Sequence, residues 1–224
     1  MTPDDYTRAR RLLLRRDPIL AAIIREHGPC GLSAAQRADH FSALVRAIVF
    51  QQLSTKAAST IYARLVALLP GGELTPAALA AVSDEQLRSA GISRQKAGYL
   101  RDLCQKVSTK VVPLDDLERM DDEQVIAALT AIKGIGRWSA EMFLMFRLHR
   151  PDVFPIGDLG IVNAVMKAYR LRKKPSPDRL RRLGENWKPY RSVASWYLWR
   201  SLGNAPGQPL AKPQPATVKK TKAV

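Results

Sequence analysis

Residues 129–146 of the chain read LTAIKGIGRWSAEMFLMF, and residues 153–165 read VFPIGDLGIVNAV. The turn Gly134-Ile135-Gly136 separates two segments with apolar residues at helical spacing, which predicts two helices joined by a tight corner. Glycines where a helix begins let its backbone N–H groups approach a phosphate closely. Asp158 follows Gly136 by 22 residues (158 − 136). A carboxylate beside bound phosphates does not increase the affinity for DNA. The combination of the glycine turn with Asp158 therefore indicates chemistry on DNA.

The charge of the chain favours the same kind of partner. Its 224 residues include 36 Lys and Arg against 20 Asp and Glu, a formal net charge of +16. Without the C-terminal lysines the excess is still about +12, and an excess of this size favours a polyanion such as nucleic acid. The alternative is a basic protein with no such partner. A hydrophobic content of 46% suffices for one large domain or two small, closely packed ones.

The cysteines and the N-terminus exclude several classes. Cys30 and Cys104 lie far apart, with no CxxC pair or histidine cluster near either. This pattern excludes a four-cysteine iron–sulfur cluster and a cysteine-based zinc site, and it favours two buried thiols in a reducing compartment. The first 20 residues are no secretory signal, and no segment reaches the ~18 apolar residues of a spanning helix. We expect a cytoplasmic, nucleoid-associated protein.

Helical patterns cover almost the whole chain. Periodic apolar residues and caps predict helices at 18–27, 41–49, from Ser54, from Ser83, from Ser93, at 121–132, after Asp158 and from 193 to near Gly203. There is no sustained period-two alternation, so the fold class is all-α, with about ten helices. We expect residues 1–204 to form one domain of two intimately packed helical lobes. Residues 205–224 are rich in Pro, Ala and Lys and predict a disordered basic tail, which either adds weak DNA affinity or has no role.

The segment IKGIGRWSA reads as a helix-hairpin-helix turn. Lys133 and Arg137 flank the turn and reach neighbouring phosphates, which holds a duplex without reading its sequence. Gly134, Gly136 and Ser139 complete the predicted DNA contact, since the N–H groups at the start of the second helix point outward. The alternative is an ordinary helical corner with a glycine cap.

Several landmarks resemble one family in the same order along the chain. They are FQQLS at 50–54, GISRQKAGYL at 91–100, KGIGRWSA at 133–140, FPIGDLGI at 154–161 and WKPYRSVASWYLW at 187–199. Together they resemble the helix-hairpin-helix DNA glycosylase superfamily, and within it the 3-methyladenine DNA glycosylase II branch of alkylation repair. Pro155-Ile156-Gly157-Asp158 departs from the family's Gly-Pro-Asp but keeps the aspartate. The resemblance implies a monomer acting on double-stranded DNA that contains alkylated bases, in a compact form without the N-terminal β domain of some members.

Base excision needs a carboxylate and a way to extrude the base. Cleaving a base from its sugar leaves an oxocarbenium-like sugar, which a fixed carboxylate stabilises. We assign this role to Asp158; the alternative is a helix N-cap, and both roles are compatible. An extruded base leaves a gap in the duplex. The resemblance places Gln52 at the wedge that fills it, with Leu53 as second choice, against a plain polar helix end with a buried leucine.

An aromatic pocket suits cationic alkylated purines, because electron-rich rings attract cations. The resemblance assigns Trp138 and Trp199 to this pocket, and Tyr190 is a further candidate. Trp187 and Trp196 belong to the pocket or to the core.

The lysine that forms a Schiff base in lyase-type relatives falls at Trp138, which implies a monofunctional glycosylase without an iron–sulfur cluster or required cofactor. The resemblance also implies a structural Na⁺ or K⁺ at the hairpin, held by the backbone carbonyls of Thr130, Ile132 and Ile135.

Three other functions fit parts of the sequence. A non-enzymatic DNA-binding module or lesion sensor needs the hairpin but not Asp158. A bifunctional glycosylase/lyase would be trapped on DNA by borohydride, and a helical adaptor would bind a protein partner without salt sensitivity.

Overall fold

The computed structural model describes residues 1–34 and 39–203. These residues form twelve α-helices and three short 3₁₀-helices, with no strand among them, which confirms the all-α class. The predicted tail, 205–224, lies outside the described residues. The helices are α1 (Pro3–Arg16), α2 (Pro18–His27), η1 (Gly31–Ala34), α3 (His40–Phe50), α4 (Thr55–Ala67), η2 (Pro70–Gly72), α5 (Pro76–Ala81), α6 (Asp84–Ser89), α7 (Arg94–Ser108), η3 (Leu114–Asp116), α8 (Asp122–Thr130), α9 (Arg137–Phe146), α10 (Leu159–Ala168), α11 (Pro177–Glu185) and α12 (Arg191–Arg200).

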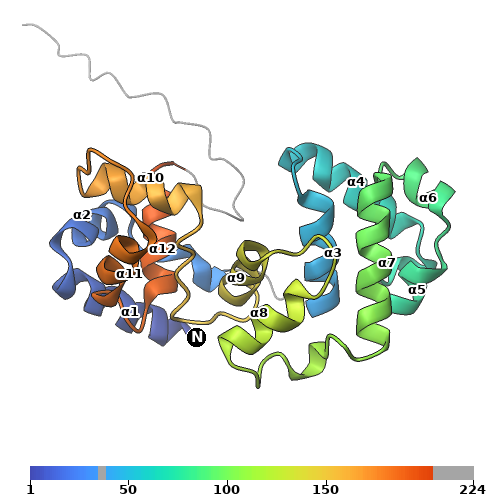
Figure 1. Cartoon of the computed structure of the whole chain (residues 1–224), viewed down its shortest axis with the longest axis horizontal. Coiled ribbons are helices and arrows are strands. Elements are labelled where there is room, and N and C mark those ends of the chain that lie inside the picture. The colour runs from blue at the N-terminus through green and yellow to red at the C-terminus, as the bar shows by residue number, and fades with distance from the viewer. Residues whose placement is uncertain (35–38, 204–224) are drawn as a thin grey trace, which may run out of the picture.

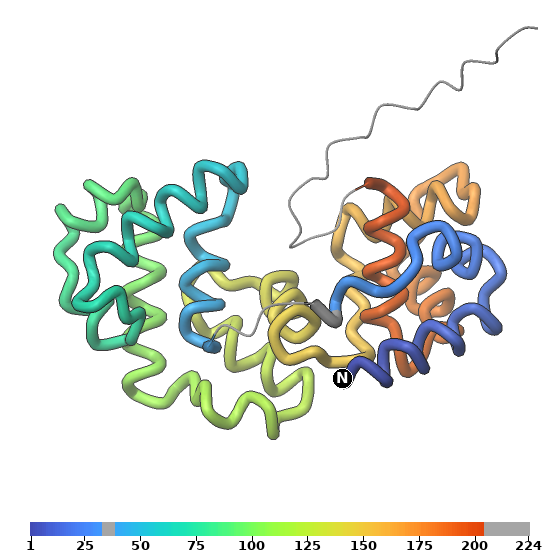
Figure 2. Tube along the Cα trace, turned by 180° about the vertical axis from the view of Figure 1, so that it is seen from behind, coloured from blue at the N-terminus to red at the C-terminus, as the bar shows by residue number. Residues whose placement is uncertain are grey.

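The helices form two lobes, which confirms the predicted two-lobed architecture (Figure 1). The terminal lobe, residues 1–34 and 147–203, combines α1 and α2 with α10, α11 and α12, so the two ends of the described chain meet. The central lobe, residues 39–146, contains α3 to α9, and α9 lies between the two lobes (Figure 2). The contacts follow the same division, because α12 packs on α1, α2 and α10 while α7 packs on α3, α5 and α6.

Predicted cap residues start the helices where the sequence indicates. Ser54 accepts the amide of Ala57, and Ser83 and Gln86 form a reciprocal capping box. Asp121 and Gln124 form another at α8. Each such cap contributes about 1 kcal/mol to the stability of its helix. Helix ends were less accurate, since α8 ends at Thr130 and not at the predicted Ile132.

Helix α1 was not predicted, and neither were α5 and α11. α1 begins with a capping box between Thr2 and Asp5. It buries a narrow stripe formed by Tyr6, Ala9 and Leu13, while charged side chains cover most of its remaining surface. A stripe of three residues is a weak periodic signal among arginines, and the helix depends on packing against α2 and α12.

Both cysteines are buried thiols, as predicted. Burial raises the pKa of the Cys30 thiol to about 12 and that of the Cys104 thiol to about 11, so neither is an activated nucleophile. Within the described residues, no helix combines the length and apolar character that crossing a membrane requires.

Candidate DNA-binding and catalytic site

The turn between α8 and α9 depends on a glycine with a left-handed backbone. Gly134 has φ +83°, and a Cβ atom built there would lie 2.3 Å from Cδ2 of the Tyr99 ring. Gly136 is the N-cap of α9 and offers no side-chain acceptor to the first turn. The first amides of α9, including those of Arg137 and Ser139, therefore keep N–H groups available at the positive end of the helix dipole. This geometry is the predicted helix-hairpin-helix, and it is suited to a phosphate.

The part of the hairpin that follows α8 is hydrogen-bonded to α7. Oδ2 of the buried Asp102 accepts the backbone N–H of Lys133 at 2.8 Å. The Lys106 ammonium donates to the same oxygen and to the carbonyl of Ala131. Burial opposes the charge of Asp102, but these donors outweigh it and lower the pKa of the carboxyl. This support could not be predicted from local sequence patterns, because it joins residues 31 positions apart.

The two predicted phosphate-binding cations differ in their surroundings. The Lys133 side chain is 73% exposed, with Nζ 3.9 Å from Asp102 Oδ1. The Arg137 guanidinium is bound at Nη2 and Nη1 by the Glu123 carboxylate, at 2.5 and 3.0 Å, and its Nε lies 3.3 Å from Glu141 Oε1. The hydrogen bonds from Arg137 lower the pKa of Glu123. Thus Lys133 faces solvent beside one carboxylate, whereas Arg137 is held between two.

The turn between α3 and α4 carries the predicted wedge residues. Gln52 is exposed and has φ +56°, a conformation that costs a non-glycine residue about 1 kcal/mol or more. Leu53 is 40% exposed. The turn is fixed to its surroundings because Gln51 Nε2 donates to the carbonyl of Gly134 at 2.8 Å, and Lys96 Nζ donates to the carbonyls of Val49 and Gln51. The wedge turn is therefore fixed to the hairpin through Gln51 and to α7 through Lys96. Neither contact was predicted from the sequence.

Asp158 is the N-cap of α10 and is also bound by two tryptophans. Its Oδ1 accepts the amide of Ile161 at 2.7 Å and the indole N–H of Trp199 at 2.8 Å. Its Oδ2 accepts the indole N–H of Trp138 at 2.7 Å. The structure thus brings together the predicted catalytic carboxylate and two predicted pocket residues, and it confirms the predicted cap.

The two indoles differ in exposure. Trp199 is 2% exposed and stacks on Phe146, with ring centroids 6.1 Å apart. Trp138 is 50% exposed. Helical spacing places Trp138, Met142 and Phe146 on one side of α9. The Asp158 carboxylate is therefore bound on Oδ2 by a half-exposed indole, Trp138, and on Oδ1 by a buried indole, Trp199.

Gly160 leaves the room that this arrangement needs. A Cβ atom at Gly160 would lie 2.9 Å from Asp158 Oδ1 and 3.0 Å from Trp199 Cδ1. The role of Gly160 was not predicted from the sequence, because it depends on Trp199, which is distant in sequence.

The other aromatic candidates lie elsewhere. Trp187 is fully buried and donates to Oδ2 of the buried Asp17 at 2.9 Å, and Trp196 is 4% exposed in the core. Tyr190 precedes α12, whereas Trp199 is near its end, so the two are about 14 Å apart along the helix axis. The structure does not bring Tyr190 to Asp158, against its assignment to the pocket.

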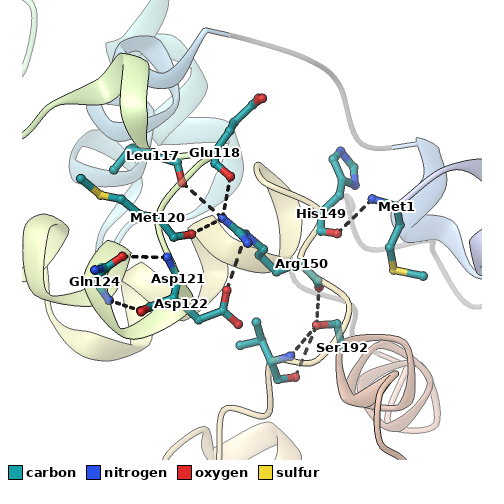
Figure 3. A network of polar contacts seen from close by, with 11 residues as sticks. Met1, Leu117, Glu118, Met120, Asp121, Asp122, Gln124, His149, Arg150 and Ser192 are labelled. Carbon is teal, nitrogen blue, oxygen red and sulfur yellow. Dashed lines mark hydrogen bonds and ion pairs between the residues drawn. The ribbon is translucent and has the colours of Figure 1, made fainter.

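A network in the segment between α9 and α10 joins the lobes (Figure 3). The Arg150 Nη2 donates to three carbonyls of the central lobe, those of Leu117, Glu118 and Met120. Its Nε lies 3.5 Å from Oδ1 of Asp122 in the first turn of α8. On the other side, Ser192 of α12 donates its hydroxyl to the Arg150 carbonyl and accepts the amide of Val153. The hairpin helices and the Asp158 lobe are therefore fixed relative to one another.

Comparisons with known proteins agree with this geometry. A model of the HhH-GPD superfamily of base excision DNA repair proteins matches residues 45–189, which include the wedge turn, the hairpin and Asp158. DNA-3-methyladenine glycosylase 1 of Schizosaccharomyces pombe is 35% identical over 168 residues, 74% of each chain.

Two solved structures share the fold. The DNA-3-methyladenine glycosidase of Bacillus halodurans has a TM-score of 0.79 and 40% identity, covering 86% of this chain and 88% of that one. The Schizosaccharomyces pombe 3-methyladenine DNA glycosylase, in complex with abasic DNA, has a TM-score of 0.73 and 31% identity, covering 87% and 96%.

Proposed function

Since the chain belongs to the HhH-GPD superfamily of base excision DNA repair proteins and is a DNA glycosylase, we propose that it hydrolyses the N-glycosidic bond of alkylated purines, 3-methyladenine among them, with Asp158 as the catalytic carboxylate. The proposed enzyme leaves the DNA strand intact. It acts as a monomer on duplex DNA in the cytoplasmic nucleoid and requires neither an organic cofactor nor an iron–sulfur cluster.

The observation that carries this proposal is the environment of the Asp158 carboxylate. Oδ1 has two donors, whereas Oδ2 has one donor, the half-exposed Trp138 indole. Three hydrogen bonds orient the carboxylate before substrate arrives, so little reorganisation is needed when positive charge develops on the sugar. Oδ2 keeps the freer lone pairs, and we assign to it the stabilisation of the oxocarbenium-like sugar and the orientation of the attacking water.

The wedge turn supports extrusion of the damaged nucleotide. Turning a base out of the stack costs a few kcal/mol, and less for a damaged base. Gln52 is exposed, in a left-handed conformation, and next to Gln51, which is bound to the hairpin. We propose that Gln52 enters the gap left by the base, with Leu53 beside it, while the amides of Gly136, Arg137 and Ser139 hold a phosphate of the same strand.

The two indoles, of Trp138 and Trp199, support recognition of a cationic base. An alkylated purine placed against Trp138 would gain up to about 2 kcal/mol from cation–π attraction when desolvated. Such a base is also a good leaving group, so one carboxylate suffices without a dedicated acid for the departing base.

The residue at the Schiff-base position supports a monofunctional reaction. A lyase needs an amine that attacks the sugar carbon to form a Schiff base. The position of that lysine in lyase-type relatives is Trp138 here, and Nζ of the nearby Lys133 lies 3.9 Å from Asp102 on the α7 side of the hairpin.

We propose a structural Na⁺ or K⁺ at the hairpin carbonyls of Thr130, Ile132 and Ile135. Thr130 ends α8, so its carbonyl belongs to the negative end of that helix dipole, and Ile132 and Ile135 follow it in the turn. The amide of Ile135 occupies one lone pair of the Ile132 carbonyl and leaves the second available. When bound, the ion would add positive charge near a phosphate, with no redox or hydrolytic role.

The test is chromatographic identification of the bases freed from alkylated genomic DNA. The unmodified chain should release 3-methyladenine, and Asp158→Asn should reduce release by at least about 10²–10³-fold. DNA binding by the variant should be unchanged or tighter, because a negative charge near phosphate is removed. The side-chain amide of Asn at this position keeps an oxygen that accepts the α10 cap bond. Its NH₂ group, however, faces an indole N–H, so two donors meet, and we expect a stability loss of about 1 kcal/mol.

Two outcomes would contradict the proposal. Tight binding without base release by the unmodified chain would identify a DNA-binding module or lesion sensor. Borohydride trapping of a covalent enzyme–DNA adduct would identify a lyase, and we expect no trapping.

A further inference from the structure

The net positive charge of the described residues comes from one lobe. In the central lobe, 12 Lys and Arg are balanced by 12 Asp and Glu. The terminal lobe has 19 against 8, a formal net charge of +11 (19 − 8). The hairpin and the wedge turn both belong to the neutral lobe. Because phosphate neutralisation dominates the affinity of proteins for DNA, the terminal lobe must supply much of the electrostatic attraction.

Within the terminal lobe, half of a 16-residue segment is cationic. This basic arm, residues 167–182, joins the end of α10 to α11. Its single acid is Asp178, which pairs with Arg181 at 2.5 Å, and no other ion pair involves the arm within the described residues. All eight cations are exposed: Lys167, Arg170, Arg172, Lys173, Lys174, Arg179, Arg181 and Arg182. By contrast, Arg137 at the hairpin is held by two carboxylates.

The backbone of the arm is well anchored. Arg170 has φ +51°, and the amide of Leu171 returns to the carbonyl of Met166 at 2.9 Å, which ends α10. Pro175 is buried, and Ser176 caps α11. The three cations Arg172, Lys173 and Lys174 are thus exposed between fixed points, so that binding phosphates would cost little backbone entropy.

The position of the arm relates it to the site. Asp158 is the N-cap of α10, which is ten residues long, so the arm starts about 15 Å from the carboxylate along the helix. In both views α10 and the α3–α4 turn lie along the upper edge of the molecule, one in each lobe (Figures 1 and 2). A span of 15–20 Å corresponds to about four to six base pairs at 3.4 Å each.

We propose that the basic arm binds the phosphate backbone of the duplex about four to six base pairs from the extruded nucleotide. The proposal rests on duplex DNA being the substrate. It divides the work of binding: the neutral lobe holds the damaged strand through backbone amides and the wedge, and the arm supplies salt-sensitive attraction at a distance.

The test compares two charge-matched triple variants of the full chain. Arg172→Gln, Lys173→Gln and Lys174→Gln remove three charges from the arm. Arg64→Gln, Arg88→Gln and Lys110→Gln remove three charges from exposed positions of the central lobe. Binding is measured against salt concentration on a duplex of about 24 base pairs with a central abasic-site analogue, and on one of about 8 base pairs that ends before the arm.

On the long duplex, the arm variant should lose about two to three from the slope of log K against log [salt] and bind about tenfold or more weakly. On the short duplex the arm variant should have the same salt slope and affinity as the unmodified chain. The control variant should equal the unmodified chain in both quantities on both duplexes. An unchanged slope on the long duplex would overturn the proposal and leave an acidic protein as the partner of the arm. An equal loss on both duplexes would also overturn it, because the charges would then act through the overall field. Base release by the unmodified chain tests the proposed function separately.

Discussion

The two lobes use their cations in different ways. In the central lobe, Lys96, Arg101 and Lys106 donate to backbone carbonyls, and Arg137 binds two carboxylates. Lys96 fixes the wedge turn, Lys106 fixes the hairpin and Arg101 fixes the segment around α5 and α6, while the 12 Asp and Glu of the lobe balance its 12 Lys and Arg. In the terminal lobe the basic arm is exposed, and Asp158 stands among indoles. In the proposed enzyme, the backbone of the central lobe holds the damaged strand, whereas the terminal lobe supplies both the electrostatic attraction and the chemistry.

The largest effect should come from the backbone of the hairpin. Gly134→Ala combines a left-handed conformation with a Cβ 2.3 Å from the Tyr99 ring, and should cost about 3 kcal/mol of stability. It should also weaken DNA binding, because the α9 amides shift. Thermal unfolding and a binding titration measure the two losses.

Gly136→Ala is the matched control, since its Cβ meets nothing within 4 Å. It should cost less than about 1 kcal/mol. Equal stability for the two variants would show that the turn does not depend on its left-handed glycine.

The next effect concerns the chemistry of the terminal lobe. Gly160→Ala should displace the Asp158 carboxylate or the Trp199 indole and slow base release by about 10–100-fold. Stability should change little, because alanine is the better helix former by about 1 kcal/mol, which offsets the crowding. Single-turnover base release and thermal unfolding together test the positioning role.

Gly157→Ala, whose Cβ meets nothing within 4 Å, should keep normal turnover. A Gly160→Ala enzyme with unchanged turnover would mean that the position of the carboxylate does not limit the reaction.

Gly134 and Gly160 also show which features can be predicted from the sequence and which cannot. Local patterns were sufficient for the all-α class, for the caps at Ser54, Ser83 and Asp121, and for the corner at Gly134. Asp158 as an N-cap followed from the same kind of local pattern. The clustering of Trp138, Trp199 and Asp158 came from resemblance, because no local rule relates residues 41 positions apart.

The remaining features depend on tertiary contacts. The bond from Gln51 to Gly134 joins residues 83 positions apart, and Gly160 matters only because Trp199 is adjacent. Tyr190 was a further pocket candidate beside Trp199, but the two lie at opposite ends of α12, which are far apart in space. The neutralisation of Arg137 by Glu123 required the packing of α8 on α9.

A third prediction breaks the connection between the lobes. Arg150→Met removes the donor to three carbonyls and leaves Asp122 without its cation, so we expect a loss of about 2 kcal/mol. Burial already raises the pKa of Asp122, with Arg150 opposing that shift. Removing Arg150 should raise the pKa of Asp122 further. At a pH above this pKa, the folded variant holds an ionised, half-buried carboxylate without its cation, which lowers its free energy of unfolding. The stability gap to the unmodified chain should therefore narrow as the pH falls and Asp122 gains a proton.

Denaturant unfolding at about pH 7 and about pH 4 measures this gap. Arg119→Met is the control, because Arg119 is 87% exposed and makes one 3.6 Å contact with an exposed Asp116. A gap for Arg150→Met that widens at low pH would contradict the assignment of Asp122 as its partner.

The smallest effect would make the central lobe more like the terminal one. Glu123→Gln removes one of the two carboxylates that bind Arg137, and the lobe gains a net positive charge. If Arg137 then reaches a phosphate, the slope of log K against log [salt] should steepen by about one, with a several-fold gain in affinity at low salt. Glu85→Gln makes the same change in charge at an exposed site away from the hairpin and should leave the slope unaltered. An equally steeper salt slope in both variants would show that net charge governs binding, and not the release of Arg137. The pairing of Arg137 with Glu123 would then have no specific effect on DNA binding.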